Sequence, residues 1–346
     1  MLRSWPTLLL ALVAIALLAF AACNDDDDGN DGNGGGTEAP DEVINLTAVH
    51  GSSVDFIAIV PLAAWSILEE RGIHVEQKYL EDGPLAIQAL EQGDAQIATN
   101  IGVNVGLLAV EEGASIIDVL ATQRPTWALV STADILTIED LEGKTIAVHG
   151  ETSFTKAVAD FYAQEFNLTM NQIIIPGSEV RAEALANNEI DASVIDFPDI
   201  VTLGRTYGED SFNVLATLGE TLPNLIEQDI WLDGDWVEEN PELALEVVTA
   251  LLEGIRKLRT DPAFALQIIT EALPEEDPDL LADLISEYTT RNIWEPNSFL
   301  TEANAEFTLK FFFDVGEIDV DPATADLTKY FNFDLVEQAL DNIGRE

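Results

Sequence analysis

The chain has 346 residues, a length that suits one large domain or two smaller ones. Acidic residues outnumber basic residues 64 to 15, and the formal net charge is −49. Such a surface repels nucleic-acid phosphates, which argues against a nucleic-acid partner, and it offers few counter-charges to an anionic substrate. The single cysteine excludes an internal disulfide, and three widely spaced histidines predict neither a metal site nor a cofactor.

The N-terminal segment has the features of an export signal. Arg3 precedes a leucine- and alanine-rich run over residues 8–19, which has the length of a signal-peptide core and is short for a membrane span of about 20 residues. The small residues that follow lead to Cys23 and resemble a bacterial lipobox, in which the cysteine becomes lipidated, although Phe20 stands where leucine is usual. We therefore expect residues 1–22 to be a signal peptide and Cys23 to carry a lipid anchor.

Two other interpretations of this segment stay open. One is an ordinary signal peptide cut after the A-x-A pattern of residues 19–21, and the other is an uncleaved anchor helix. All three interpretations place the rest of the chain outside the cytoplasm, and lipidation would hold it at the cell membrane.

Residues 23–42 continue as an acidic, glycine-rich stretch. Counted from Asn24, the spacing fails the calcium-loop pattern, because the first ligand is asparagine and Gly35 stands where a bidentate glutamate is needed. The composition predicts a disordered linker instead, and the 19 residues from Asn24 to Glu42 would reach roughly 25 Å as a flexible chain. A globular body on this tether could turn freely near a membrane.

Strand and helix patterns alternate along the next part of the chain. We predict strands over residues 43–49, 75–79, 95–99, 115–122, 145–148, 173–176 and 192–195. The helices predicted between them cover residues 55–70, 84–92, 103–112, 149–167 and 181–188. This alternation predicts an α/β protein with mostly parallel sheets, in which ligands bind beyond the carboxyl ends of the strands.

The last third of the chain is predicted to be helical. Its expected helices cover residues 241–259, 262–273, 278–288, 301–316 and 335–343. No nucleophile elbow, Walker loop, H-E-x-x-H motif or dinucleotide fingerprint occurs in the sequence, so there is little reason to expect an enzyme.

Polar and aromatic residues gather where the predicted strands end. These candidate ligand-binding residues are His50, Ser53, Asp55, Phe56, Thr99, Asn100, Gln123, Trp127, Glu151, Thr152, Ser153, Asp196 and Phe197. Aromatic rings offer faces for stacking, and the carboxylates accept hydrogen bonds from N–H or O–H groups. With Arg124 and Lys156 as the only bases nearby, the set favours a neutral or weakly basic planar ring over a small anion.

Each of these residues also has a purely structural interpretation. Thr152 or Ser153 could serve only as a helix cap, and Trp127 and Phe197 could be ordinary core residues. His50 could be a buried histidine with a local hydrogen-bond partner. Their shared position at the strand ends of two α/β units is what favours a binding site.

Several short motifs, in order, resemble one family of proteins. The motifs are G-P-L-A-I-Q-A-L-E-Q-G-D-A at residues 83–95, D-L-E-G-K-T-I-A-V at 140–148, the stretch 182–197 and N-P-E-L at 240–243. Their order and spacing resemble the NMT1/THI5-like solute-binding proteins of ABC importers, over roughly residues 43–344. The stretch Q-R-P-T-W-A-L-V-S at 123–131 looks more like the THI5-like branch than the sulfonate and nitrate branch.

The resemblance implies a two-lobed fold of the type II periplasmic-binding-protein kind. One lobe would comprise residues 43–131 and 227–346 and the other residues 132–226, with a hinge near Ser131 and Ile226. Such a protein captures a small-molecule ligand and delivers it to a membrane permease, without catalysis. Members of the THI5-like branch bind riboflavin or thiamine pyrimidines.

Other functions stay open on the same residues. An aliphatic sulfonate, taurine or nitrate is the alternative ligand, and a pyrimidine-forming enzyme or a sensor domain is the alternative class. The eukaryotic enzymes of this group use an iron-binding cysteine cluster, whereas this chain has only Cys23, so that activity is not expected here.

Overall fold

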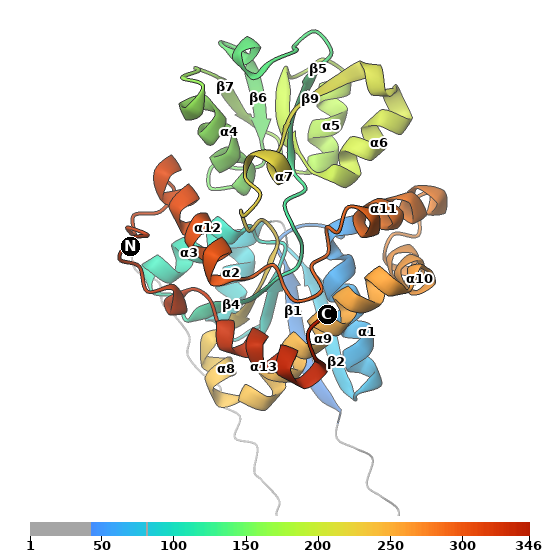
Figure 1. Ribbon diagram of the computed structural model, residues 1–346, viewed down its shortest axis with the longest axis vertical. Coiled ribbons are helices and arrows are strands. Elements are labelled where there is room, and N and C mark those ends of the chain that lie inside the picture. The colour runs from blue at the N-terminus through green and yellow to red at the C-terminus, as the bar shows by residue number, and fades with distance from the viewer. Residues whose placement is uncertain (1–42, 81) are drawn as a thin grey trace, which may run out of the picture. The chain divides into compact units, whose positions relative to one another are not determined.

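The computed structural model describes residues 43–80 and 82–346 (Figure 1). The signal peptide, the lipidated Cys23 and the linker predicted over residues 1–42 lie outside this part of the chain. Within the described residues, no helix combines the length and the apolar composition that a membrane crossing requires.

The first sheet has five strands in the order β2-β1-β3-β10-β4. Its strands are β1 (Ile44–His50), β2 (Ile73–Tyr79), β3 (Ile97–Thr99), β4 (Ile116–Ala121) and β10 (Asp229–Asp233). β1 pairs in parallel with β2 and β3, and β10 runs antiparallel to both β3 and β4. The carboxyl ends of the four parallel strands therefore meet at one edge of the sheet, which is where the chain leaves for its binding loops.

The second sheet repeats this plan with the order β7-β6-β8-β5-β9. Its strands are β5 (Ala128–Thr132), β6 (Thr145–Val148), β7 (Asn171–Ile174), β8 (Ala192–Ile195) and β9 (Phe212–Thr217). β5 runs antiparallel to β8 and β9, whereas β6 is parallel to β7 and β8. In each sheet the reversed strand is thus the first one after the chain crosses over from the other sheet.

Because β5 belongs to the second sheet, the boundary between the two lobes lies earlier in the chain than Ser131. A division after Ser131 would leave residues 128–131 with the first sheet, but these residues pair with β8 and β9. The chain therefore leaves the first sheet directly after β4 and crosses over residues 122–127. The return crossing runs over residues 218–228 and includes α7 (Leu218–Thr221).

Helices cover both sheets. Those of the first α/β unit are the short 3-10 turn η1 (Phe56–Ala58), α1 (Ile59–Glu70), α2 (Gly83–Glu91) and α3 (Val103–Glu112). Those of the second are η2 (Ile138–Leu141), α4 (Phe154–Glu165), α5 (Ser178–Ala186), α6 (Phe197–Tyr207) and η3 (Glu209–Ser211). Figure 1 shows α4, α5 and α6 around the second sheet and α1, α2 and α3 around the first.

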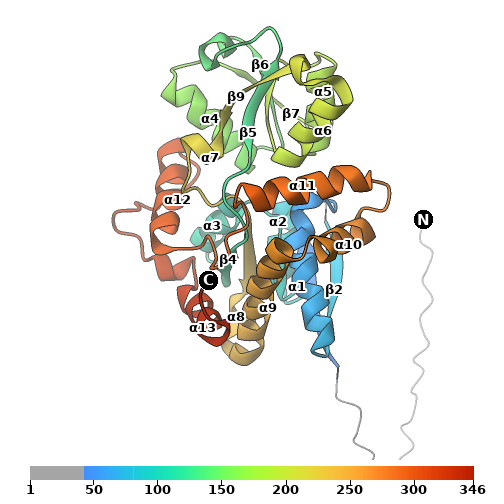
Figure 2. The same cartoon turned by 45° about the vertical axis from the view of Figure 1, so that its right-hand side comes forward.

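The helical C-terminal part packs back onto the first sheet, as predicted. It comprises α8 (Gly234–Glu239), α9 (Pro241–Thr260), α10 (Pro262–Ala272), α11 (Pro278–Thr290), α12 (Glu302–Val315), η4 (Leu327–Lys329) and α13 (Phe333–Ile343). α9 lies along α1, where Gly254 lets the backbones come close, because a Cβ there would lie 3.1 Å from the nitrogen of Ala64. Figure 2 shows α11 lying between these helices and the second sheet, where it contacts α6.

The sequence-based prediction found seven of the eight parallel strands and missed β9 together with the two reversed strands, β5 and β10. β5, β9 and β10, together with α6, lie in stretches to which no element was assigned. The physical reason is that the prediction followed the alternation of strand and helix, and β5 and β10 interrupt it because each is entered directly from a crossing. β10 is further hidden by its sequence, D-I-W-L-D, in which the apolar run is only three residues long.

One helix-to-strand contact depends on a glycine. Gly106 of α3 lies against the indole ring of Trp231 in β10, and a Cβ on Gly106 would come within 2.2 Å of that ring. Trp231 is fully buried, and its indole N–H donates to an oxygen of Asp229 at 2.7 Å. Burying Trp231 therefore also buries the carboxyl group of Asp229, which accepts the hydrogen bond from the indole.

Asp229 has a second carboxyl group beside it in this core. Asp118 of β4 is fully buried and accepts a hydrogen bond from the backbone N–H of Leu120, while one oxygen of each aspartate has no partner among the described residues. Burial raises the pKa of Asp229 to about 7, and burial together with repulsion from Asp229 raises the pKa of Asp118 well above its usual range. The two carboxyls are therefore held partly protonated.

This pair predicts a stability that falls as the pH rises. Between about pH 4 and about pH 7 the folded chain keeps protons that the unfolded chain has already released, so the free energy of unfolding decreases through this window. Asp118→Asn keeps the bond to Leu120 and removes one of the two charges. We expect it to raise Tm by about 2–4 °C near pH 8 and to change it little near pH 5.

Thermal unfolding followed by circular dichroism checks this expectation. Asp94→Asn removes a charge from an exposed aspartate and serves as the matched control. A Tm difference between Asp118→Asn and the wild type that is the same at both pH values would contradict the assignment.

Candidate ligand-binding site

A cavity of about 850 Å³ lies where the strand ends of the two sheets face one another. The first sheet contributes the loop after β1, the start of α2 and the loop after β3, and the second contributes the loops after β6, β7 and β8. Trp127, Glu227 and Gln228 from the two crossings and leucines of α11 complete the lining. A cavity of this size accommodates a small organic molecule.

Nine of the thirteen candidate residues line this cavity. They are Ser53, Asp55, Phe56, Asn100, Trp127, Glu151, Thr152, Ser153 and Asp196. The other four lie behind the cavity wall, and they are His50, Thr99, Gln123 and Phe197. The structure thus gathers most of the predicted set at one place, from segments as far apart as residues 53 and 196.

His50 and Thr99 form a buried pair at the ends of β1 and β3. The Nδ1 of His50 lies 2.6 Å from the Oγ1 of Thr99, and its ring stacks on Tyr79 with a centroid separation of 4.5 Å. Burial lowers the pKa of His50 to about 4, so the imidazole is neutral. His50 therefore matches its structural interpretation, that of a buried histidine with a local partner.

Gln123 does not line the cavity, but its side-chain amide hydrogen-bonds to Glu227, which does. Glu227 was not among the candidate residues predicted from the sequence. The carboxylate of Glu227 accepts hydrogen bonds from the backbone N–H of Thr126 at 2.6 Å, the hydroxyl of Thr126 at 2.6 Å and the amide of Gln123 at 3.3 Å. Its other oxygen lies 3.4 Å from the backbone nitrogen of Trp127. One buried side chain thus holds the two crossing segments together.

Phe197 packs outside the cavity at the start of α6. Its ring centroid lies 6.0 Å from that of Tyr288 in α11, and the guanidinium of Arg291 lies 4.7 Å above the ring. The residue therefore joins α6 to α11 by an aromatic contact and a cation–π contact.

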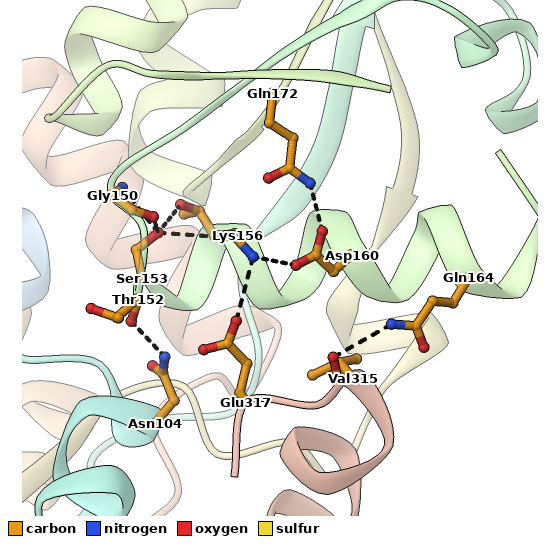
Figure 3. A network of polar contacts seen from close by, with 11 residues as sticks. Asn104, Gly150, Thr152, Ser153, Lys156, Asp160, Gln164, Gln172, Val315 and Glu317 are labelled. Atoms are coloured by element: carbon orange, nitrogen blue, oxygen red, sulfur yellow. Dashed lines mark hydrogen bonds and ion pairs between the residues drawn. The ribbon is translucent and has the colours of Figure 1, made fainter. Parts of the chain in front are cut away.

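The loop after β6 is fixed by the network shown in Figure 3. Ser153 caps α4, because its hydroxyl oxygen accepts from the backbone N–H of Lys156 at 3.3 Å. The side-chain amide of Asn104 in α3 donates to the backbone oxygen of Thr152 at 2.7 Å. These bonds place the start of α4, with its free backbone N–H groups, at the cavity wall.

Lys156 and Arg124, the two bases expected near the site, point elsewhere. The ammonium of Lys156 lies between Asp160 at 2.6 Å and Glu317 at 3.7 Å (Figure 3). Arg124 pairs with Glu295 at 2.5 Å. Neither residue lines the cavity.

Carboxyl groups dominate the polar lining instead. Among the described residues, the acidic ones at the cavity are Asp55, Asp82, Glu151, Glu179, Asp196, Asp199, Glu227 and Glu276. Desolvation and the charge of Asp199 raise the pKa of Asp55 to about 7. Burial raises the pKa of Glu227 to about 7. Burial and repulsion from Asp199 raise the pKa of Asp196, and burial, with a contribution from the charge of Glu179, raises the pKa of Asp199.

Arg181 is the one arginine at the cavity, and the part of the lining that the structure describes contains no lysine. It is fully buried in α5, and its guanidinium donates to the backbone oxygens of Ile175, Gly177 and Val194 and to the hydroxyl of Ser193. Desolvation lowers its pKa to about 10, which still leaves it charged at neutral pH. His149 also lines the cavity, and burial lowers its pKa as well.

Three residues of the site were not predicted from the sequence, and the reasons differ. Asp199 stands three residues after the predicted Asp196 and donates its backbone N–H to that carboxylate at 3.1 Å, so a capping pattern at residue 196 would have identified it. Glu227 and Arg181 gave no local signal, because their partners are far away in the sequence or belong to the backbone.

The fold defined by these sheets is that of the periplasmic binding proteins. The zinc-bound ligand-binding component of an ABC-type import system from Staphylococcus aureus superposes with a TM-score of 0.70 at 11% identity, covering 86% of this chain and 99% of that chain. The nitrate-binding protein NrtA from Synechocystis PCC 6803 gives a TM-score of 0.69 at 13% identity, with 88% and 90% covered. The aliphatic sulphonate-binding protein SsuA from Escherichia coli gives 0.65 at 15% identity, with 83% and 92% covered.

The model of the NMT1/THI5-like family matches residues 68–265, and this chain belongs to that family. The resemblance inferred from the sequence motifs and the predicted α/β fold with mostly parallel sheets are both confirmed. Among curated protein sequences, none matches this chain.

Glu227 offers a direct test of how the crossings are held. Glu227→Gln places an amide nitrogen among groups that already donate, so at least one buried donor loses its acceptor. We expect the free energy of unfolding to fall by about 1–3 kcal/mol. Urea denaturation near pH 8, with Glu275→Gln at an exposed glutamate as the control, measures the loss, and a wild-type midpoint for Glu227→Gln would contradict it.

Proposed function

We propose that this protein is the extracytoplasmic solute-binding component of an ABC importer. It captures a small planar heterocycle, such as riboflavin or a thiamine pyrimidine, and delivers it to a membrane permease. Family membership, the binding-protein fold and a cavity of about 850 Å³ between the two sheets support this proposal. Binding needs no covalent chemistry from the protein.

The proposed mechanism is closure of two lobes about the crossings. One lobe contains the first sheet with the C-terminal helices, and the other contains the second sheet. The crossings run side by side, because the backbone N–H of Thr122 donates to Gln228 at 2.9 Å and that of Leu218 donates to Trp127 at 2.8 Å. A ligand that contacts both lobes stabilises the closed arrangement by the contacts that the open one lacks.

The composition of the cavity carries the proposal about the ligand. Phe56, Trp127 and Phe154 offer apolar and aromatic surface, and the polar groups are mostly carboxyls that accept from N–H or O–H groups. A small oxyanion would meet eight acidic side chains and one arginine whose guanidinium already binds four protein oxygens. A heterocycle with N–H groups fits these partners better.

An aliphatic sulfonate, taurine or nitrate is the second candidate ligand. Two proteins of similar structure are named as sulphonate- and nitrate-binding proteins. The start of α4 also lies at the cavity wall, and the free backbone N–H groups of a helix start favour a bound anion.

A ligand panel read by thermal shift decides between the two. Riboflavin and the hydroxymethyl aminopyrimidine of thiamine form one arm, and taurine, alkanesulfonates and nitrate form the other. At 100 times its dissociation constant the true ligand stabilises the folded state by about 2.7 kcal/mol. We expect a rise in Tm with a heterocycle; a rise only with the anions would contradict the ligand, and turnover of any compound would indicate an enzyme.

The proposed membrane anchor is tested at Cys23, which lies outside the described residues. We expect Cys23→Ser to release the protein from the membrane fraction and to leave the dissociation constant for the ligand unchanged, because lipidation needs the thiol. Cell fractionation measures the release. A variant that stays membrane-bound would indicate that residues 8–19 remain as an uncleaved anchor.

A further inference from the structure

Two sets of carboxyl groups face each other across the cavity, one from each lobe. Asp55 comes from the turn after β1, and Asp196 and Asp199 come from the start of α6 beyond β8. We propose that the cavity selects a ligand with a positively charged nitrogen, which lies between Asp55 and the Asp196–Asp199 pair and draws the two lobes together. This inference rests on the proposed function and adds the charge of the ligand to it.

The carboxyls are held in place before any ligand arrives. Asp196 Oδ1 accepts from the backbone N–H of Asp199 at 3.1 Å, and the hydroxyl of Ser178 lies 3.4 Å from the same oxygen. Asp55 Oδ1 accepts from the backbone N–H of Ala58 at 3.3 Å. Each of the two carboxyls is thus fixed by hydrogen bonds within its own lobe, and both residues line the cavity.

The charges of these groups act on one another. Repulsion from Asp199 contributes to the raised pKa of Asp55, and repulsion from Asp55 contributes to that of Asp196. Closing the lobes on an empty cavity brings like charges together, which opposes closure. A cation between them replaces this repulsion by two attractions, so it favours closure more than a neutral molecule of the same shape does.

A buried tyrosine lies close to carboxyl groups of both lobes. Tyr288 of α11 is fully buried, and its hydroxyl has no hydrogen-bond partner among the described residues. Asp196, Glu227 and Asp55 all act on this hydroxyl, because their charges add to the effect of burial in raising its pKa. Tyr288 does not line the cavity, and its hydroxyl brings no positive charge to these carboxyls.

The protein neutralises this cluster only in part, because the guanidinium of Arg181 attracts Asp196 and Asp199 while no cation of the described lining lowers the pKa of Asp55. In the lining that the structure describes, the positive charge comes from Arg181, whose guanidinium donates to four oxygens of its own lobe. Lys156 is paired with Asp160 and Glu317 outside the cavity.

The cluster also differs from the acidic surface that a net charge of −49 produces. Surface carboxylates are solvated by water and screened by salt. Asp196 and Glu227 are only 4% and 2% exposed, so their carboxyl groups have lost most of the hydration that would stabilise the charged form. A solvated acidic face gives no reason for such burial at a cavity wall.

Two nearly identical probes isolate the charge of the ligand. They are the hydroxymethyl aminopyrimidine of thiamine and its aminomethyl analogue, in which an amine that is protonated at neutral pH replaces the neutral hydroxyl. Isothermal titration near pH 7.5 gives both dissociation constants. We expect the aminomethyl compound to bind at least about tenfold more tightly, since charge-assisted hydrogen bonds to carboxylates are about twice as strong as neutral ones.

Variants on both lobes show whether the named carboxyls are responsible. We expect Asp199→Asn and Asp55→Asn each to reduce the preference for the aminomethyl compound about tenfold or more, with a smaller effect on the hydroxymethyl compound. Asp94→Asn removes the same charge at an exposed position and should keep the wild-type preference. Because the two variants lie on different lobes, either one is sufficient if the other fails to fold by circular dichroism.

The outcomes separate this inference from the proposed function. Binding of the hydroxymethyl compound or riboflavin, with no preference for the aminomethyl compound, overturns the inference and leaves the proposed function standing. A preference that survives in Asp199→Asn and Asp55→Asn also overturns it. Binding of taurine, a sulfonate or nitrate alone, or of no compound in the panel, overturns both.

Discussion

The buried carboxylate of Glu227 is the interaction on which the arrangement of the two sheets depends. It stands in the return crossing and accepts hydrogen bonds from residues of the first crossing, including the backbone N–H of Thr126. Backbone bonds such as the one from Thr122 to Gln228 also join the crossings, and the hydroxyl of Thr122 donates to the same oxygen at 3.4 Å. Because these crossings are the covalent connections between the sheets, this side chain sets where the hinge can bend and where the cavity lies.

The polar lining of the cavity consists mainly of carboxyl groups, with one arginine among the described lining residues. Burial raises the pKa of Asp55, Asp196 and Asp199 at the cavity wall. A chain selected for stability alone would not bring these groups together, since a desolvated and unpaired carboxylate lowers stability. Their position at the wall of one cavity between the two sheets is typical of a functional site.

Much of the fold was visible in the sequence. Most of the parallel strands and most of the C-terminal helices were predicted, because they follow alternation and helical periodicity, with clear stops such as Gly113 and Gly316. β5 and β10 were missed because they run against their neighbours and break that alternation. In the site, Asp55 and Asp196 were found because they follow strands, whereas Glu227 comes from a distant segment that only the folded chain brings to the cavity.

The most direct test of this account is the identity of the molecule that the protein carries. Native mass spectrometry of the protein, purified without unfolding from the cells that produce it, measures the mass and charge of a retained ligand. The account predicts one small organic molecule per chain, planar and with a basic nitrogen, that dissociates when the protein is unfolded. A retained sulfonate or nitrate, or a protein that binds no planar heterocycle under any condition, would contradict it.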